Sequence, residues 1–274
     1  MLEFEFMRKT LLASFMLSIM IPLIGVVMVN RRTSMIGDAL SHTSLAGVAI
    51  GLIFGFDPVI GAIAVCIVAA LSIEGIRKRF PHFGDMATAV IMSTGLGLAA
   101  VLSDFAPGGN TFESYLFGSI SSVTWNDLIL ISLVFVLVVL FSIIYYSALL
   151  DISLDSNLAR LAGVPVKWVN TIFTILSAIT IGLASKVVGA LLVASLMVLP
   201  VATALSVCRS YKSTVITTIL LGATYTLLGI TQSFYFDIKP GGAIVLNAVV
   251  GMLICAIYNR VKKKPVRLTQ PLDE

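Results

Sequence analysis

Long apolar segments separated by short polar stretches run from one end of the chain to the other. They cover residues 11–30, 35–55, 58–76, 86–103, 127–148, 169–185, 187–207, 214–233 and 241–259. Most approach the length of about 20 residues that a helix needs to cross a bilayer. They are too long and too uniformly apolar for barrel strands, which alternate between polar and apolar positions. The pattern predicts an all-α polytopic membrane bundle of eight or nine helices, because segments between residues 35 and 76 could merge. We expect a single domain over residues 1–274.

The composition supports this prediction and excludes several classes of protein. Of 274 residues, 58% are hydrophobic and 12% are charged, and the mean hydropathy is +1.04. A soluble domain is usually about 25% charged. A soluble enzyme, a nucleic-acid-binding protein and a disordered scaffold are therefore poor fits. The three cysteines, Cys66, Cys208 and Cys255, are far apart and form neither a disulfide framework nor a CxxC metal motif.

The distribution of basic residues predicts the orientation in the membrane. Cytoplasmic loops are enriched in Lys and Arg, and five basic groups fall in alternate loops of a nine-span chain. These groups are Arg31–Arg32, Arg77–Arg79, Arg160 with Lys167, Arg209 with Lys212, and Lys262–Lys264. The C-terminus is therefore expected inside and the N-terminus outside, although Arg8 and Lys9 oppose this assignment. The first apolar run lacks a small-residue cleavage pattern, so we expect it to remain as a span.

The second apolar segment carries an acidic residue and a histidine at helical spacing. Asp38 and His42 are four positions apart, which places them about 40° apart around a helix. Gly47, Gly51 and Gly55 form consecutive GxxxG steps on the opposite side, and such spacing allows helix backbones to approach closely in lipid. The sequence thus predicts one packing face and a separate polar face.

This polar pair has two interpretations. Ionisable residues within a span are costly and usually face a cavity or pathway, and zinc accepts both imidazole nitrogen and carboxylate oxygen. Two ligands do not complete a tetrahedral site, but a two-fold dimer would supply Asp38 and His42 twice. Alternatively, the pair forms a hydrogen bond that fastens helices, or Asp38 is stabilised by the helix dipole. The spacing alone leaves both interpretations open.

The cytoplasmic loop at residues 153–164 predicts a short capped helix. Ser153 or Asp155 can cap its start, Gly163 fits the position after its end, and Pro165 stops it. Such a helix either docks against a partner or lies on the bilayer. The chain contains no GxxxxGK[ST] phosphate loop. If ATP drives transport, another subunit must bind the nucleotide.

Several motifs resemble the permease subunits of bacterial zinc/manganese ABC importers. They are MIGDALSHTSLAGVAIG at 35–51, YLFG at 115–118, SKVVGALLVASLMVLPVATA at 185–204, FDIKPGGAIVL at 236–246, and the D-x-x-x-A-x-x-x-G pattern at Asp155, Ala159 and Gly163. The motif order is kept over nearly the whole chain. The resemblance favours the zinc-type members, with manganese or iron as the alternative.

The resemblance implies a homodimeric permease in the bacterial plasma membrane. Two ATP-binding subunits and an extracytoplasmic metal-binding protein would be its partners, and the divalent metal ion would be its cargo rather than a resident cofactor. It also implies that Asp38 and His42 line the translocation path, and that Asp155, Ala159 and Gly163 belong to the helix that couples to the ATPase. The chain itself would not be an enzyme.

Two other classes compete with this interpretation. A self-sufficient secondary metal transporter would need several acids within its spans, but the middle regions of the other spans lack carboxylates. A membrane scaffold would use the Asp38–His42 pair only to fasten helices.

Overall fold

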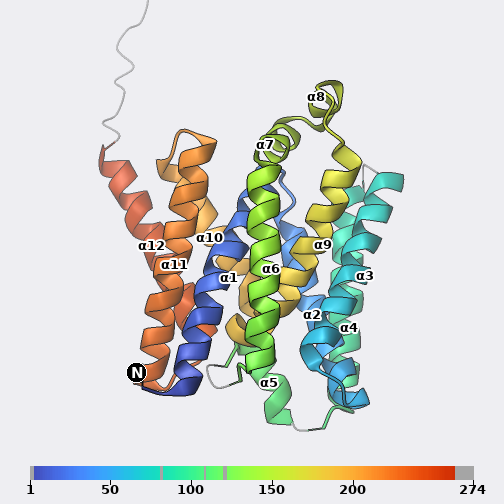
Figure 1. Ribbon diagram of the computed structural model, residues 1–274, viewed down its shortest axis with the longest axis vertical. Helices are drawn as coiled ribbons and strands as arrows, with labels where there is room; N and C mark the ends of the chain where they lie inside the picture. The colour runs from blue at the N-terminus through green and yellow to red at the C-terminus, as the bar shows by residue number, and fades with distance from the viewer. Residues whose placement is uncertain (1–2, 81–82, 108, 120–121, 263–274) are drawn as a thin grey trace, which may run out of the picture.

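The computed structural model describes residues 3–80, 83–107, 109–119 and 122–262, and these residues form helices joined by short connections (Figure 1). The long helices are α1 (Glu5–Asn30), α2 (Ser34–Phe54), α3 (Pro58–Arg79), α4 (Gly84–Ser103), α6 (Trp125–Ile144), α9 (Val166–Ala184), α10 (Ala190–Val207), α11 (Tyr211–Phe236) and α12 (Pro240–Lys262). The shorter elements are α5 (Gly109–Phe117), α7 (Tyr146–Leu154), α8 (Ser156–Leu161) and the π-helical turn η2 (Ser185–Gly189). The described residues contain no strand, which confirms the predicted all-α membrane bundle.

Within the described residues, eight helical stretches are long and apolar enough to cross a membrane. One of them is the 42-residue stretch Val166–Val207. Its backbone leaves the helical conformation at Gly189, where φ is +97°. From that point α10 runs back beside α1 and α2, in the direction opposite to α9 (Figure 1). The predicted segments 169–185 and 187–207 are therefore separate passes.

The fifth predicted segment, 127–148, differs from the structure. Helix α6 ends at Ile144, and Tyr145, with φ −98° and ψ 21°, separates it from α7. Hydropathy does not reveal this break because the residues on both sides of it are apolar.

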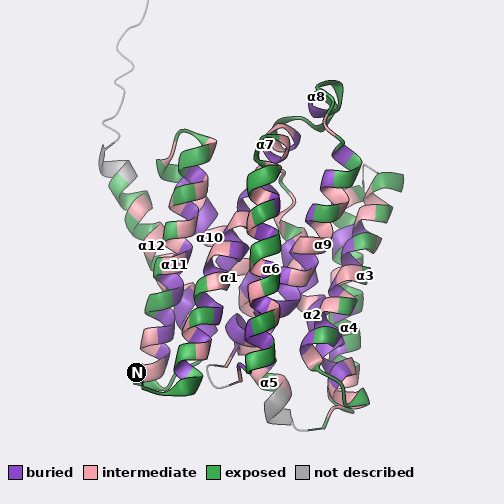
Figure 2. Cartoon of the chain, in the orientation of Figure 1, coloured by how far each residue is buried: buried purple, intermediate pink, exposed green. Residues whose placement is uncertain are grey.

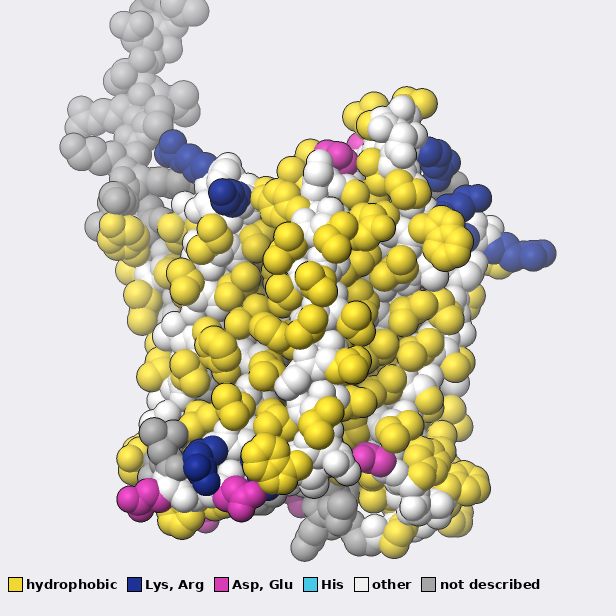
Figure 3. All heavy atoms as spheres, viewed as in Figure 1, with side chains coloured by type: hydrophobic (Ala, Val, Ile, Leu, Met, Phe, Trp, Pro, Cys, Tyr) yellow, Lys and Arg dark blue, Asp and Glu magenta, His cyan; other side chains and the backbone are white. Residues whose placement is uncertain are grey.

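The basic loops gather at one end of the molecule, as predicted. The connections α1–α2, α3–α4, α8–α9 and α10–α11 lie at this end, where Figure 3 shows most of the Lys and Arg side chains. By the positive-inside rule we expect this end to face the cytoplasm, and it is called the cytoplasmic end below. Lys263 and Lys264 lie outside the described residues. At the opposite end, Lys9 pairs with Glu5 at 2.7 Å and lies 4.8 Å from the centre of the Trp125 ring, so its charge is balanced locally.

Helix α2 lies in the interior of the bundle, against α3, α4 and α10 (Figure 2). A Cβ on Gly47 would lie 2.3 Å from the Gly61 carbonyl oxygen, and one on Gly51 would lie 2.6 Å from the Pro58 Cα. These two glycines therefore form the predicted packing face against α3. Gly55 does not take part: it ends α2 with φ +71°, and a Cβ added there would meet no atom of another segment within 4 Å. Its role is to permit the left-handed turn at the helix end.

Candidate functional site

The predicted polar pair lies on the least buried stripe of α2. Asp38 and His42 have side chains that are 35% and 22% exposed, whereas most of the following turns of the helix are buried. Their Oδ1 and Nε2 atoms are 3.6 Å apart, too far for a strong hydrogen bond but within reach of a shared ligand. The two side chains share one face because they are one helical turn apart.

One nitrogen of His42 is not satisfied by any of the described residues. Its Nδ1 atom is buried and has no hydrogen-bond partner among the described residues. A buried polar atom without a partner costs about 1–3 kcal/mol, so this atom needs a further ligand, a water or a group from another chain. The described residues contain no group of three or more His, Cys, Asp or Glu side chains that could hold a metal ion. One copy of the site thus provides two candidate ligands.

Close packing on a neighbouring face of α2 fixes the position of this pair. A Cβ on Gly37 would lie 2.0 Å from the Met197 Cε of α10, and one on Gly25 of α1 would lie 2.3 Å from the Met197 carbonyl oxygen. Met197 is itself buried. The cytoplasmic half of α2 is therefore held against Met197 of α10, which also packs against α1, on a face about 100° around the helix from Asp38.

At the outer end, three of the motif runs meet at one point. Gly118 of the YLFG motif, Gly189 of the 185–204 run and Gly241 of the 236–246 run approach one another so closely that added Cβ atoms would clash with backbone. A Cβ on Gly189 would lie 2.4 Å from the Phe117 carbonyl carbon, and one on Gly241 would lie 2.0 Å from the Val188 oxygen. Both Gly118 and Gly189 also have positive φ angles. Only glycine satisfies both demands.

A buried ion pair that was not predicted from the sequence adjoins this junction. Lys186 Nζ of η2 lies 2.7 Å from Asp127 Oδ2 at the start of α6, and the two side chains are only 12% and 5% exposed. Asp127 also accepts hydrogen bonds from the backbone N–H and the hydroxyl of Thr124, which caps α6. The Thr-x-x-Asp pattern before an apolar run is a capping-box signal that could have marked Asp127. The pairing with Lys186, 59 positions away, has no local signal.

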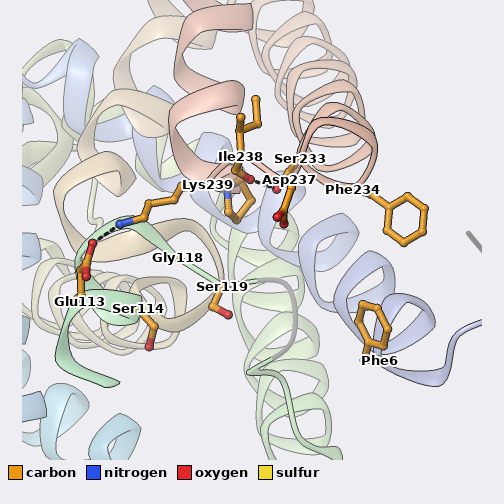
Figure 4. A pocket seen from close by; sticks show the side chains of 11 residues that line it. Phe6, Glu113, Ser114, Gly118, Ser119, Ser233, Phe234, Asp237, Ile238 and Lys239 are labelled. Atoms are coloured by element: carbon orange, nitrogen blue, oxygen red, sulfur yellow. Dashed lines mark hydrogen bonds and ion pairs between the residues drawn. The ribbon is translucent and has the colours of Figure 1, made fainter. Parts of the chain in front are cut away.

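A cavity of about 550 Å³ lies beside this junction at the outer surface (Figure 4). Lys239 pairs with Glu113 across it and lies 4.5 Å from the centre of the Phe117 ring. Asp237 lines the same cavity (Figure 4). Nearby, burial raises the pKa of the Tyr115 phenol, and the negative charges of Asp57 and Asp127 raise it further. The outer end thus offers a hollow lined by both signs of charge.

At the cytoplasmic end, α8 is a capped helix of 6 residues. Asp155 Oδ1 accepts hydrogen bonds from the backbone N–H groups of Asn157 and Leu158. Gly163 has φ +84°, its N–H donates to the Arg160 carbonyl, and the Val164 N–H donates to the Ala159 carbonyl. This is a Schellman ending. The predicted cap at Asp155 and the predicted place of Gly163 just after the helix end are confirmed.

The predicted helix is shorter than expected because its first residues belong to α7. Ser153 lies in α7 and donates its hydroxyl to the Leu149 carbonyl at 2.6 Å, so it does not cap α8. Ala159 is buried, whereas Leu158 and Leu161 are 64% and 85% exposed. The helix therefore presents apolar side chains away from the bundle.

Comparison with known proteins identifies the family. The ABC 3 transport family matches residues 3–259. The chain belongs to this family. Its relatives include a probable metal transport system membrane protein of Treponema pallidum, which is 34% identical over 95% of this chain and 98% of the relative. The predicted resemblance to metal ABC permeases is thus confirmed.

Two other relatives of this chain are named for different metals. The zinc uptake membrane protein ZnuB of Haemophilus influenzae is 29% identical, over 94% of this chain and 98% of that protein. The manganese transport membrane protein MntC of Listeria monocytogenes is 27% identical, over 94% of this chain and 92% of that protein. A solved structure, PsaBC from Streptococcus pneumoniae in complex with Fab, superposes with a TM-score of 0.83 at 30% identity, covering 92% of this chain and 91% of that one.

Proposed function

We propose that this ABC 3 family chain is the permease subunit of an ATP-driven importer of divalent metal ions. Two copies would form a homodimer in the bacterial plasma membrane, and each would contribute Asp38 and His42 to the translocation path. The observation that carries the proposal is the adjacent carboxylate and imidazole on the partly exposed stripe of an otherwise buried helix, with the His42 Nδ1 atom unsatisfied. Relatives named for zinc and manganese uptake support it.

The chemistry of the pair suits a transported ion. Two carboxylates and two imidazoles from a two-fold dimer would form a four-ligand site, which matches the tetrahedral preference of zinc. We favour zinc as the cargo for this reason. Manganese is the alternative, because it accepts the same ligands together with additional oxygen or water ligands. No metal would remain bound as a resident cofactor.

Helix α8 would be the contact through which the ATPase subunits drive transport. The chain has no phosphate-binding loop, so the proposal assigns ATP hydrolysis to two separate subunits. The exposed Leu158 and Leu161 give α8 an apolar surface for such a partner, and Asp155, Ala159 and Gly163 hold its shape. An extracytoplasmic metal-binding protein would deliver the ion at the opposite end.

Packing between helices offers a route by which motion at α8 would reach the metal pair. Helix α8 adjoins the start of α9, α9 packs along α3, and α3 packs along α2. The contacts are tight: a Cβ on Gly182 of α9 would lie 3.0 Å from Ile63 of α3, and Gly47 of α2 meets Gly61 of α3 through the backbone. Closely packed helices move by sliding or rotating as units. Displacing α8 would therefore shift the stripe that carries Asp38 and His42.

The test is metal uptake in a metal-starved strain that lacks the chromosomal gene. Cells would express the wild-type chain, Asp38→Asn, His42→Ala or the control Asp104→Asn, which alters an exposed carboxylate at the outer end of α4. Membrane levels would be matched by immunoblot, and cell zinc and manganese would be measured by mass spectrometry. We expect wild type and Asp104→Asn to restore zinc, and the two pair variants to fall at least tenfold below them.

Other outcomes would decide against parts of the proposal. If the wild-type chain restored cell manganese but not cell zinc, manganese rather than zinc would be the cargo. If Asp38→Asn and His42→Ala took up metal at the wild-type rate but had reduced thermal stability, the pair would serve only to hold helices together. Proton-coupled zinc flux into liposomes that contain only this chain would identify a secondary transporter instead.

A further inference from the structure

A second cavity, of about 790 Å³, opens at the cytoplasmic end between α1, α2, α3, α7 and α9. Ile36 and Leu40 of α2 line its floor together with Phe173 of α9. Both α2 residues lie about 160° around the helix from Asp38, since each residue advances by about 100°. This cavity is therefore separate from the proposed metal path.

The mouth of the cavity is basic. Four cationic side chains and two carboxylates line it: Arg31, Arg32, Arg77, Lys78, Glu74 and Asp155. Lys78 is paired with Glu74 at 2.7 Å, and Asp155 accepts the N–H groups that begin α8. None of the three arginines forms an ion pair with a described carboxylate. The mouth thus carries an excess of positive charge on side chains that can form paired hydrogen bonds.

Arg31 is held in place for such bonding. One guanidinium nitrogen donates to Asn170 Oδ1 at 2.9 Å, and the guanidinium carbon lies 6.0 Å from the centre of the Phe173 ring. Burial lowers the pKa of Arg31, and the nearby positive charge of Arg77 lowers it further, whereas the negative charge of Glu74 raises it. The protein therefore keeps two guanidinium groups close together and partly removed from water, an arrangement that an anion would stabilise.

We propose that this cavity binds a phosphate-bearing anion, which Arg31 and Arg77 would hold at its mouth. Guanidinium groups recognise phosphate oxygens through paired, charge-assisted hydrogen bonds. Basic pockets between membrane helices on the cytoplasmic side bind the headgroups of anionic lipids, and the apolar floor suits part of an acyl chain. A soluble phosphate presents the same chemistry to the mouth. The bound anion would connect the cytoplasmic ends of α1 and α3 with the start of α8.

The test measures thermal unfolding of the full-length chain purified in a neutral detergent. Short-chain phosphatidylglycerol, inorganic phosphate and short-chain phosphatidylcholine would be titrated separately against the wild type. The variants are Arg31→Gln, Arg31→Lys and Arg77→Gln. The control is Arg209→Gln, which removes an exposed charge at the same end but outside the cavity. Native mass spectrometry would count the lipids retained.

We expect phosphatidylglycerol, but not phosphatidylcholine, to raise the melting temperature of the wild type and of Arg209→Gln by several degrees. The phosphatidylglycerol concentration that gives half of this stabilisation should rise at least tenfold in Arg77→Gln and Arg31→Gln. It should rise by less in Arg31→Lys, which keeps the positive charge but loses the guanidinium group that forms paired hydrogen bonds. Stabilisation by inorganic phosphate to the same extent would identify a soluble anion as the ligand, whereas a response to phosphatidylglycerol alone would identify a lipid.

Two results would overturn the proposal. One is that neither anion stabilises the wild type more than phosphatidylcholine does. The other is that Arg77→Gln responds like the wild type. The hydrogen bond to Asn170 is donated by Arg31, so Arg77→Gln keeps that bond and tests the proposal even if Arg31→Gln fails to fold.

Discussion

Replacing Gly47 with alanine should destabilise the protein, because α2 and α3 touch there through their backbones. The new Cβ would lie 2.3 Å from the Gly61 oxygen and 2.7 Å from the Ala62 Cα, whereas ordinary contact begins at 3.4 Å. The helices must therefore separate by about 1 Å, because a backbone carbonyl cannot rotate away as a side chain can. Separation of this kind would also displace Asp38 and His42.

The expected cost follows from two opposing terms. Overpacking a close contact costs about 1–3 kcal/mol. Alanine in place of glycine within a helix returns about 0.5–1 kcal/mol, since glycine loses more backbone entropy on folding. A clash at 2.3 Å with backbone atoms places the overpacking cost in the upper half of its range, so the net destabilisation should be about 1–2.5 kcal/mol. Gly97→Ala of α4 is the matched control: no atom lies within 4 Å of its added Cβ, so it should be neutral or stabilise by up to about 1 kcal/mol.

Cys66 provides the assay because it is fully buried in the folded chain. In a Cys208→Ser, Cys255→Ser background, reaction of Cys66 with a thiol dye during detergent-induced unfolding reports the free energy of unfolding. Gly61→Ala creates the same clash from the other side, so the double variant with Gly47→Ala should lose less than the sum of the single losses. Equal stability of Gly47→Ala and wild type, or an equal loss in Gly97→Ala, would refute the packing argument.

Three further predictions concern the helix ends and the outer junction. Asp127→Asn and Lys186→Met should each lower the free energy of unfolding by about 3–5 kcal/mol, because a buried charge loses its partner. In the same unfolding assay, the double variant should recover part of this loss. Strictly additive losses would contradict the pairing. Asp155→Ala should lower co-purification of an ATPase partner and destabilise α8 by about 1 kcal/mol, measured by pull-down, with unchanged capture counting against a coupling role. Gly189→Ala should prevent correct folding because of its φ of +97° and the clash with α5, whereas Gly242→Ala, with open space around its Cβ, should fold; size-exclusion profiles of both variants check this.

Features encoded by neighbouring residues could be predicted from the sequence. The apolar segments predicted the passes, and the basic loops predicted which ends lie together, because a bilayer imposes both requirements on the local sequence. The four-residue spacing of Asp38 and His42 predicted a shared face, which the 3.6 Å separation of their atoms confirms. Their contact with a metal stays a prediction. The cap at Asp155 could also be predicted from the sequence, because its carboxylate accepts hydrogen bonds from N–H groups only two and three positions ahead.

Features made by residues distant in the chain required the tertiary structure. Nothing near Lys186 indicates Asp127, and nothing near Arg31 indicates that Arg77 lies beside it at a cavity mouth. Gly55 continues the GxxxG spacing but has no helix against it, because α2 ends there. Periodicity and capping determine which face of a helix is apolar and where the helix stops. Which helices become neighbours depends on the close packing of the whole bundle, and that packing decided where charges are paired, left in excess or excluded from water.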